Sequence, residues 1–366
     1  MRVFHVGAEQ FSELPALPTA LPAQGFIWVG STRREFEARI ADLQAALQAW
    51  TGSQLVDLHI SDLLNRQLPS HYDYTSWYDM LVFRRLAAGT PTDVTVVEAD
   101  KAPANPAPPA LAGIDTSAVG FAIFDRVLVT VHPTDCAVRD FFANRLAGLA
   151  GSGDARGAAR LPGSPADLML RMVSHMVDSY LDLRRLLTRQ LGALQGQLLD
   201  PRSRFTNWQV LLESRNALHL LEDTCEDQRS AVQEWIDALD EWPSAPDPQG
   251  QRDRELLRVR SRDVLEHIER VLSHVRRLEQ SAETAVQMHF SALSHRTNDI
   301  MRTLTVLTAI FMPLNLITGF FGMNFDALPL IHSATGIWVA FGLMAVIGIG
   351  LAVFFRRKRY LGTTPR

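Results

Sequence analysis

Polar side chains recur along one face of an otherwise apolar segment near the C-terminus. From Thr303 to Phe325 no side chain carries a formal charge. Residues spaced by three or four positions here are Asn298, Met301, Thr305, Thr308, Met312, Asn315 and Gly319. That spacing puts them on one side of a helix. A polar stripe is costly in lipid unless it meets other helices or a watery path, so the pattern favours a pore lining. Close packing between helices through small and hydroxyl residues is the alternative.

Two segments have the length and composition of membrane spans. The first covers about Met301–Phe321 and the second about Thr335–Phe355. Each provides about 20 apolar residues, which is the number a helix needs to cross a hydrocarbon core of about 30 Å. Pro313 removes one backbone donor inside the first segment. A hairpin that serves only as an anchor is the simpler interpretation of two such spans.

Basic residues flank the two spans on one side. Arg296 and Arg302 precede or begin the first span, and Arg356–Arg359 follow the second. The positive-inside rule therefore predicts that both termini are cytoplasmic. The connecting loop, about Gly322–Ala334, is then external.

Composition excludes several other classes of protein. The net charge of −4 argues against a nucleic-acid binder. Two cysteines, Cys136 and Cys225, lie too far apart in sequence to suggest a disulfide framework or a zinc knuckle. The N-terminal residues MRVFHVGAEQ have no apolar core of a signal peptide, so none is predicted. The histidines have no zinc-ligand spacing, and no catalytic constellation is recognisable, so the sequence does not predict an enzyme.

The N-terminal part alternates strand and helix patterns. Strands are predicted at Gly25–Gly30, Met80–Arg84, Val94–Glu98, Val119–Phe124 and Val127–His132, and helices at Glu35–Trp50 and Ser61–Leu64. Lys101–Gly113 and Gly151–Pro165 are rich in breakers and are predicted to be loops. The second of these contains GSGDARG, but it lacks the Lys-Ser/Thr pair of a phosphate-binding loop.

After Ser164 the sequence is predominantly helical. Ser164, Pro165 and Asp167 form an N-terminal capping pattern for a helix that is predicted to reach about Leu199. A second helix is predicted over Thr206–Asp240, a break over Trp242–Gly250, and a third helix from Gln251 into the first span. A heptad seam is expected at Val264, Ile268, Val271, Val275, Leu278, Ala282 and Ala285.

The run MRTLTVLTAIFMPLNLITGFFGMNF, residues 301–325, closely resembles the first transmembrane helix of the CorA family of divalent-cation channels. Phe321-Gly322-Met323-Asn324 stands where that family has Tyr-Gly-Met-Asn. Further similar stretches are His59–Asn65 with Asp79–Arg84, Val127–His132, Asp263–Leu304 and the basic tail. The ZntB-type zinc transporters are a sister branch with the same architecture.

The resemblance implies an α+β membrane protein that assembles as a funnel-shaped homopentamer. Each subunit would have an N-terminal α/β/α cytoplasmic domain and a long stalk helix that continues into the first of two C-terminal transmembrane helices. The expected parts are the α/β domain at 1–163, the helical region at 164–300, the pore-lining helix at 301–321, the external loop at 322–334, the second span at 335–355 and the basic tail at 356–366. The expected partners are other copies of the chain, the lipid bilayer of the inner (plasma) membrane and divalent cations, without nucleic acid.

The family's positions also assign roles to residues. Gly322, Met323 and Asn324 correspond to a selectivity filter, and Asp326 to a ring of negative charge at the outer mouth. Mg²⁺ gives up its water reluctantly, so neutral Asn324 amides would suit a hydrated ion better than carboxylates. The pore lining would comprise Asn298, Met301, Leu304, Thr305, Thr308, Met312, Asn315 and Gly319, with Asn315 and Thr308 as polar stations and Met301, Leu304 and Met312 as constrictions.

Regulation by intracellular cations is a further implication of the resemblance. Asp263 matches an acidic position at which the family binds Mg²⁺ between subunits to hold the channel closed, and Asp115 is the candidate for its partner. A solvated stalk carboxylate is the simpler interpretation of Asp263. No covalent cofactor is expected, and Mg²⁺, or Co²⁺, Ni²⁺ or Zn²⁺, would be both the transported and the regulatory ion.

Three departures from the family pattern leave the cargo open. Phe321 replaces the usual Tyr, Leu330 stands where many relatives have Glu, and Asn315 where Thr is frequent. Phe325-Asp326 replaces the Gly-Gly that often follows the motif in the zinc branch, which favours the CorA type. A ZntB-type zinc transporter, with or without proton coupling, remains an alternative, as does a membrane-anchored interaction or sensor protein.

Overall fold

The computed structural model describes residues 1–88, 114–151, 160–199, 208–242, 248–323 and 334–358. These residues form two compact units, Met1–Glu283 and Thr284–Arg366. Helix α8, Pro248–Phe321, contributes residues to both units. The predicted strand Val94–Glu98 and the predicted loop Lys101–Gly113 lie outside the described residues.

A seven-stranded sheet forms the centre of the first unit, with the strand order β2-β1-β3-β9-β8-β5-β4. Its strands are β1 Arg2–Val6, β2 Phe11–Leu14, β3 Phe26–Thr32, β4 His71–Tyr74, β5 Asp79–Arg84, β8 Ala118–Ile123 and β9 Val127–His132. Neighbouring strands are antiparallel except for the parallel pair β3–β9. A short second sheet pairs β6, Ala87–Ala88, with β7, Ile114–Asp115. The predictions for β3, β5, β8 and β9 are confirmed to within two residues at either end, whereas the sequence analysis did not identify β1, β2 or β4.

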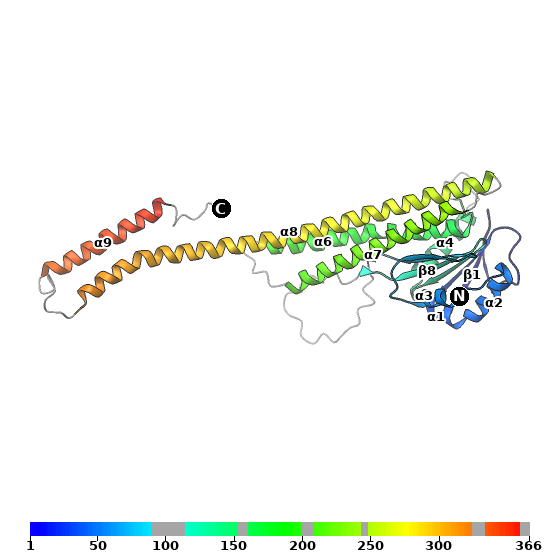
Figure 1. Ribbon diagram of the computed structural model, residues 1–366, viewed down its shortest axis with the longest axis horizontal. Coiled ribbons are helices and arrows are strands. Elements are labelled where there is room, and N and C mark those ends of the chain that lie inside the picture. Colours follow the sequence, from blue (N-terminus) through cyan, green and yellow to red (C-terminus); the bar gives the residue numbers. More distant parts are fainter. Residues whose placement is uncertain (89–113, 152–159, 200–207, 243–247, 324–333, 359–366) are drawn as a thin grey trace. The chain divides into compact units, whose positions relative to one another are not determined.

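Helices cover both faces of this sheet (Figure 1). One core contains Val3, Ile27 and Ala122 from the strands, and the other contains their chain neighbours Phe4, Trp28 and Phe121, as the two-residue period of a strand requires. Helices α1 Arg33–Ala38, α2 Ile40–Thr51 and α3 Asp57–Leu64 pack on the first face. Helices α4 Ala137–Gly151, α5 Pro165–Asp178, α6 Tyr180–Leu199, α7 Trp208–Glu241 and the start of α8 pack on the second. The predicted α/β/α arrangement is therefore confirmed.

Two helices predicted as continuous are each divided. The Glu35–Trp50 pattern breaks at Arg39, whose backbone angles of φ −119° and ψ 18° are not helical. A capping box between Thr32 and Glu35 starts the first piece, α1, directly after β3. The predicted helix from Ser164 to Leu199 is likewise wrong as a single element.

Ser179 separates α5 from α6. Its hydroxyl donates to the carbonyl oxygen of Met176 at 2.6 Å and lies 3.1 Å from that of Leu86. A serine that bonds to nearby carbonyl groups competes with the helical ladder, and this interaction is not visible in the periodicity of the sequence. The predicted N-terminus of α5 is confirmed, because the Ser164 side chain accepts a hydrogen bond from the Asp167 amide.

Five of the seven residues of the predicted heptad seam on α8 are buried, and Leu278 and Ala282 are partly buried. Val264, Ile268 and Val275 are at most 1% exposed. The helix begins at Pro248, three residues before the predicted start, because proline fits the first helical position, where no amide donor is needed. Arg254 of α8 donates to two carbonyl oxygens at the C-terminal end of α7, those of Leu239, at 2.9 Å, and Trp242.

The second unit contains the C-terminal part of α8 and helix α9, Ala334–Arg357. Both helices are long and apolar enough to cross a membrane, judged by length and composition. A Cβ atom placed on Gly348 of α9 would lie 3.8 Å from the Leu314 side chain of α8. The two helices are therefore in ordinary packing distance at this point, with room for a small side chain at position 348.

Candidate functional site

The apolar part of α8 has two different faces. On one face Val306 is 2% exposed, and Ala309, Ile310, Pro313, Leu314 and Ile317 are partly buried. On the opposite face all the predicted pore residues are exposed, namely Asn298, Met301, Leu304, Thr305, Thr308, Met312, Asn315 and Gly319. At about 100° of rotation per residue the two sets lie on opposite sides of the helix axis. Within a single chain the polar stripe is therefore uncovered.

The threonine hydroxyls on this stripe are oriented by the helix itself. Thr305 donates to the carbonyl oxygen of Met301 at 2.8 Å, and Thr308 donates to that of Leu304 at 2.9 Å. Because each hydroxyl proton is used within the helix, the lone pairs of the oxygen remain for another donor. Such oxygen atoms, together with the exposed amide of Asn315, can accept hydrogen bonds from the water shell of a cation.

Helix α8 ends where the Gly-Met-Asn motif begins. The amide of Gly322 donates to the Thr318 carbonyl at 2.9 Å, and the Met323 amide donates to that of Phe320 at 3.4 Å. Gly322 and Met323 are exposed. Asn324 and Asp326 lie outside the described residues.

Asp263 lies on α8 in the first unit. Its side chain is 60% exposed, and its carboxylate is 3.8 Å from Nε2 of His267. His267 also lies 3.4 Å from the carboxylate of Asp178 on α5. Asp263 is thus accessible and only loosely paired. His267 was not predicted as a partner of Asp263, although the four-residue spacing between them is a helical contact distance that could have identified it.

Asp115 is held by a different basic residue. It forms an ion pair with Arg85, which also lies 2.5 Å from Asp135. Burial lowers the pKa of Arg85, but the two carboxylates outweigh that effect and raise it. The Asp115 carboxylate also accepts a hydrogen bond from the Ser117 amide at 2.9 Å. Asp115 and Asp263 therefore lie on different elements and have separate partners within one chain.

A histidine and two glutamates on α7 and α8 lie close enough to hold a metal ion. Among the described residues, His219, Glu222 and Glu279 have ligand atoms within 4.8 Å of one another. His219 lies 3.2 Å from Glu279, while Arg276 lies 2.6 Å from Glu222 and also pairs with Glu226. These ion pairs link α7 to α8, and they explain why the side chains lie close together. This group was not predicted from the sequence, because Glu279 is distant in sequence from His219 and Glu222.

The family-like stretch at His59 has a structural role. His59 is 3% exposed, and its two ring nitrogens lie 2.8 Å from the Tyr78 hydroxyl and 3.1 Å from the Asp73 carboxylate. Burial raises the pKa of Asp73, but hydrogen bonds from His59 and the Tyr74 amide lower it by more, so the net shift is downward. This network fastens α3 to the β4–β5 hairpin.

Comparison with known proteins agrees with this architecture. Residues 106–357 match the family model of the CorA-like Mg²⁺ transporter protein. The cobalt/magnesium transport protein CorA of Thermotoga maritima is 33% identical over 100 residues, which is 27% of this chain and 28% of that protein. The metal ion transporter YfjQ of Bacillus subtilis is 46% identical over 65 residues, 18% of this chain and 20% of that protein.

The matched regions thus span less than a third of these two relatives. Over the whole fold, the chain is similar to the complete structure of the CorA magnesium transporter from Methanocaldococcus jannaschii. The TM-score is 0.64 with 18% sequence identity, and the alignment covers 98% of both chains. That similarity is one of fold, and it includes the α/β unit, the long helix and the two apolar helices.

Proposed function

Because this chain belongs to the family of CorA-like Mg²⁺ transporter proteins, we propose that it transports divalent metal cations across a membrane. The family is one of transporters and not of enzymes. The proposed cargo is Mg²⁺ and Co²⁺, in keeping with the names of the relatives from Thermotoga maritima and Methanocaldococcus jannaschii. Ni²⁺ is proposed as a further substrate.

One observation carries the proposal: the polar stripe of α8 is exposed and lies opposite the partly buried face around Val306 and Leu314. A stripe of hydroxyl and amide oxygens in a membrane span needs a polar surrounding. A closed ring of copies supplies one by turning each stripe toward the common axis. The homopentamer is the assembly proposed here.

The proposed path ends at a filter formed by Gly322, Met323 and Asn324. A ring of neutral Asn324 amides would accept hydrogen bonds from the waters of a hydrated ion without removing them. Asp326, slightly further out, would concentrate cations at the mouth. The roles of Asn324 and Asp326 are assigned from their positions in the sequence motif.

The membrane potential is the proposed driving force. A divalent ion moving across 100 mV gains about 4.6 kcal/mol, twice the value for a single charge. The basic residues Arg356 and Arg357 at the end of α9 favour an arrangement with both termini in the cytoplasm. The inner (plasma) membrane is the proposed location.

Intracellular divalent cations are the proposed gating ligand. Asp263 has the exposure and the weak pairing that a cation between subunits requires, because replacing a 3.8 Å contact with His267 costs little. Asp115 would have to exchange Arg85 for the cation, so its participation requires a larger rearrangement. Loss of the bound cations would leave carboxylates facing one another and favour the open state.

Ion flux into proteoliposomes tests the function. The purified protein is assayed with Mg²⁺, Co²⁺, Ni²⁺ and Zn²⁺ side by side, at a fixed inside-negative potential, with and without a proton gradient. The expected result is Mg²⁺ uptake that depends on the membrane potential and does not change when a proton gradient is imposed. Uptake of Zn²⁺ alone, dependent on protons, would identify a ZntB-type transporter. No uptake of any ion, beside a working control channel, would favour an anchored interaction or sensor protein.

A further inference from the structure

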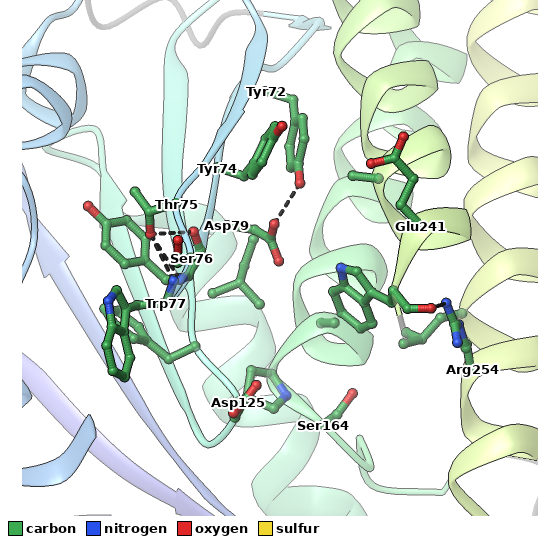
Figure 2. Close-up of a pocket in the computed structure, with 18 of the residues that line it drawn as sticks. Tyr72, Tyr74, Thr75, Ser76, Trp77, Asp79, Asp125, Ser164, Glu241 and Arg254 are labelled. Atoms are coloured by element: carbon green, nitrogen blue, oxygen red, sulfur yellow. Dashed lines mark hydrogen bonds between the residues drawn. The ribbon is translucent and has the colours of Figure 1, made fainter. Parts of the chain in front are cut away.

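A cavity of about 660 Å³ lies in the first unit (Figure 2). Its walls come from the β4–β5 hairpin, the β8–β9 turn, the start of α5 and the facing ends of α7 and α8. This volume falls in the range of about 300–1,000 Å³ that is usual for small-molecule sites. None of the proposed transport residues lines it.

Aromatic rings form much of the wall. Tyr72 and Tyr74 are stacked with centroids 6.2 Å apart, and Trp77, Tyr78 and Trp242 also line the cavity. Tyr74 and Trp77 remain 65% and 62% exposed at the hairpin, although large aromatic side chains are normally covered. Figure 2 shows Tyr72 and Tyr74 at one side of the cavity and Trp77 beyond Thr75 and Ser76. The faces of aromatic rings carry partial negative charge, so exposed rings beside a cavity can attract a cation.

Carboxylates supply the charge of the cavity. Its lining includes Asp79, Asp125, Glu241 and Asp253, whereas Arg254 is the basic residue among its described lining residues. Arg254 donates to the carbonyl oxygens of Leu239 and Trp242 at the end of α7, so part of its hydrogen-bonding capacity serves to cap that helix. The cavity therefore has an excess of negative charge.

Asp79 is the most enclosed of these carboxylates. Its side chain accepts a hydrogen bond of 2.6 Å from the Tyr72 hydroxyl, and burial raises its pKa. A carboxylate accepts more than one hydrogen bond, so Asp79, which lines the cavity, keeps acceptor capacity for a ligand donor. A cationic ligand there would restore part of the solvation that Asp79 loses on folding.

The arrangement does not suit a metal ion held by three or more protein side chains. In the described part of the chain, the His/Asp/Glu group with ligand atoms within 4.8 Å is His219, Glu222 and Glu279, which lies outside the cavity. The cavity carboxylates are instead distributed around its wall. Separated negative groups joined by aromatic surface fit an extended cation, whose methylene segments pack on the rings while its charged ends meet carboxylates.

We infer that this cavity binds an aliphatic amine with two or more ammonium groups, a polyamine-class cation. The exposed rings of Tyr74 and Trp77 hold the methylene chain and one ammonium by cation–π attraction, and Asp79 accepts a hydrogen bond from an ammonium end. The site is independent of the proposed transport function. Its test is therefore a binding measurement and not a flux measurement.

Calorimetry with spermidine tests the inference on the full-length detergent-solubilised protein, in about 150 mM salt to screen surface attraction. Wild-type protein binds spermidine, and 1,8-octanediol, a neutral molecule of similar length, does not bind. Asp79→Asn and Tyr74→Leu each weaken spermidine binding about tenfold, the factor that corresponds to about 1.4 kcal/mol. The matched control Glu37→Gln, which removes an exposed carboxylate on α1 outside the cavity, leaves binding unchanged.

Several outcomes would overturn the inference. They are no spermidine binding at millimolar concentration, equal affinity for the diol, wild-type affinity in both cavity variants, and displacement of spermidine by equimolar Mg²⁺. Tyr74 is exposed, so Tyr74→Leu keeps its fold and isolates the contact even if Asp79→Asn lowers stability. The melting temperature of each variant without ligand checks this.

Discussion

The indole nitrogen of Trp235 on α7 donates a 2.9 Å hydrogen bond to the Ser261 hydroxyl on α8. Both residues are buried, and the Ser261 hydroxyl in turn donates to the Leu257 carbonyl oxygen at 2.8 Å. The pair fixes the register of the two helices two residues from Asp263. A sliding movement of α8 along α7 would break this bond.

Ser261→Ala is expected to destabilise the first unit by about 1–3 kcal/mol, because it leaves the buried indole N–H without an acceptor. Thermal unfolding of the purified protein measures the loss. Ser273→Ala, on an exposed position of the same helix, is the matched control and should change little. Equal melting temperatures for both variants would show that water replaces the lost acceptor.

The polar stripe leads to a second prediction. Thr308→Val keeps the shape of the side chain but removes the oxygen that faces away from the partly buried side of α8. Ion flux is expected to fall about five- to tenfold, since losing one acceptor of about 1 kcal/mol or more raises the barrier accordingly. Proteoliposome uptake of Mg²⁺ measures this.

Thr303→Val is the control for the stripe. Thr303 makes the same type of bond, to the Asp299 carbonyl oxygen at 2.8 Å, but it lies off the stripe. Its replacement should leave flux within about twofold of wild type, since no proposed ion contact is lost. Equal losses in Thr303→Val and Thr308→Val would indicate a general effect on the helix and contradict a pore lining at Thr308.

How far the sequence predicts this molecule depends on the range of each interaction. The α8 seam through Val264 and Ile268 and the polar stripe at Thr305 follow from side-chain periodicity. Strand β9 follows from its β-branched composition, and both signals are local. The breaks at Arg39 and Ser179 do not follow from either signal, because hydrophobic spacing continues across both of them.

Contacts between different helices and strands could not be predicted from the sequence for another reason. Three interactions join residues whose proximity is set by the sheet order and helix packing. They are the Tyr72–Asp79 hydrogen bond, the His219–Glu279 ion pair and the Asp115–Arg85 ion pair. No spacing rule connects them. Helix α4 was missed because its alanines and glycines give only a weak apolar face.

The filter motif gives a third prediction. Asn324→Ala removes the proposed acceptors for the ion's water shell, so transport should be abolished while the assembly stays intact by size-exclusion chromatography. Asn324→Asp would instead create a ring of carboxylates that holds the ion and slows its release. Tighter Mg²⁺ binding with lower flux is then expected. Wild-type flux in Asn324→Ala would remove Asn324 from the filter.

Regulation is tested at Asp263. Asp263→Asn should raise the Mg²⁺ concentration needed for half-closure about tenfold, which corresponds to about 1.4 kcal/mol of lost coupling. Electrical recordings over a range of cytoplasmic-side Mg²⁺ measure the shift. Glu269→Gln, at an exposed position on the same helix, is the matched control. An unchanged closure curve for Asp263→Asn would identify Asp263 as a solvated carboxylate of the stalk.

Stability at mildly acidic pH should depend on His132 in β9. The ring is fully buried beside Thr130, whose hydroxyl lies 2.8 Å from Nε2, and burial lowers the pKa of His132 from 6.5 to about 3. Between these two values the unfolded chain takes up a proton that the folded protein does not, so the free energy of unfolding falls as pH falls. The loss contributed by His132 is about 1.4 kcal/mol per pH unit across this window and is absent above pH 6.5.

His132→Gln separates this effect from the other titrating groups. Burial also lowers the pKa of His175 and His274, and the folded-state pKa of Glu35 is lowered to about 2 by hydrogen bonds and by the N-terminal charge, which together outweigh its burial. Those residues are intact in the variant, so the difference in pH slope between variant and wild type belongs to position 132. Denaturant unfolding at pH 7, 6 and 5 measures that difference, and the variant should lose less stability than wild type on acidification. Identical slopes would mean that the folded protein accommodates a protonated His132.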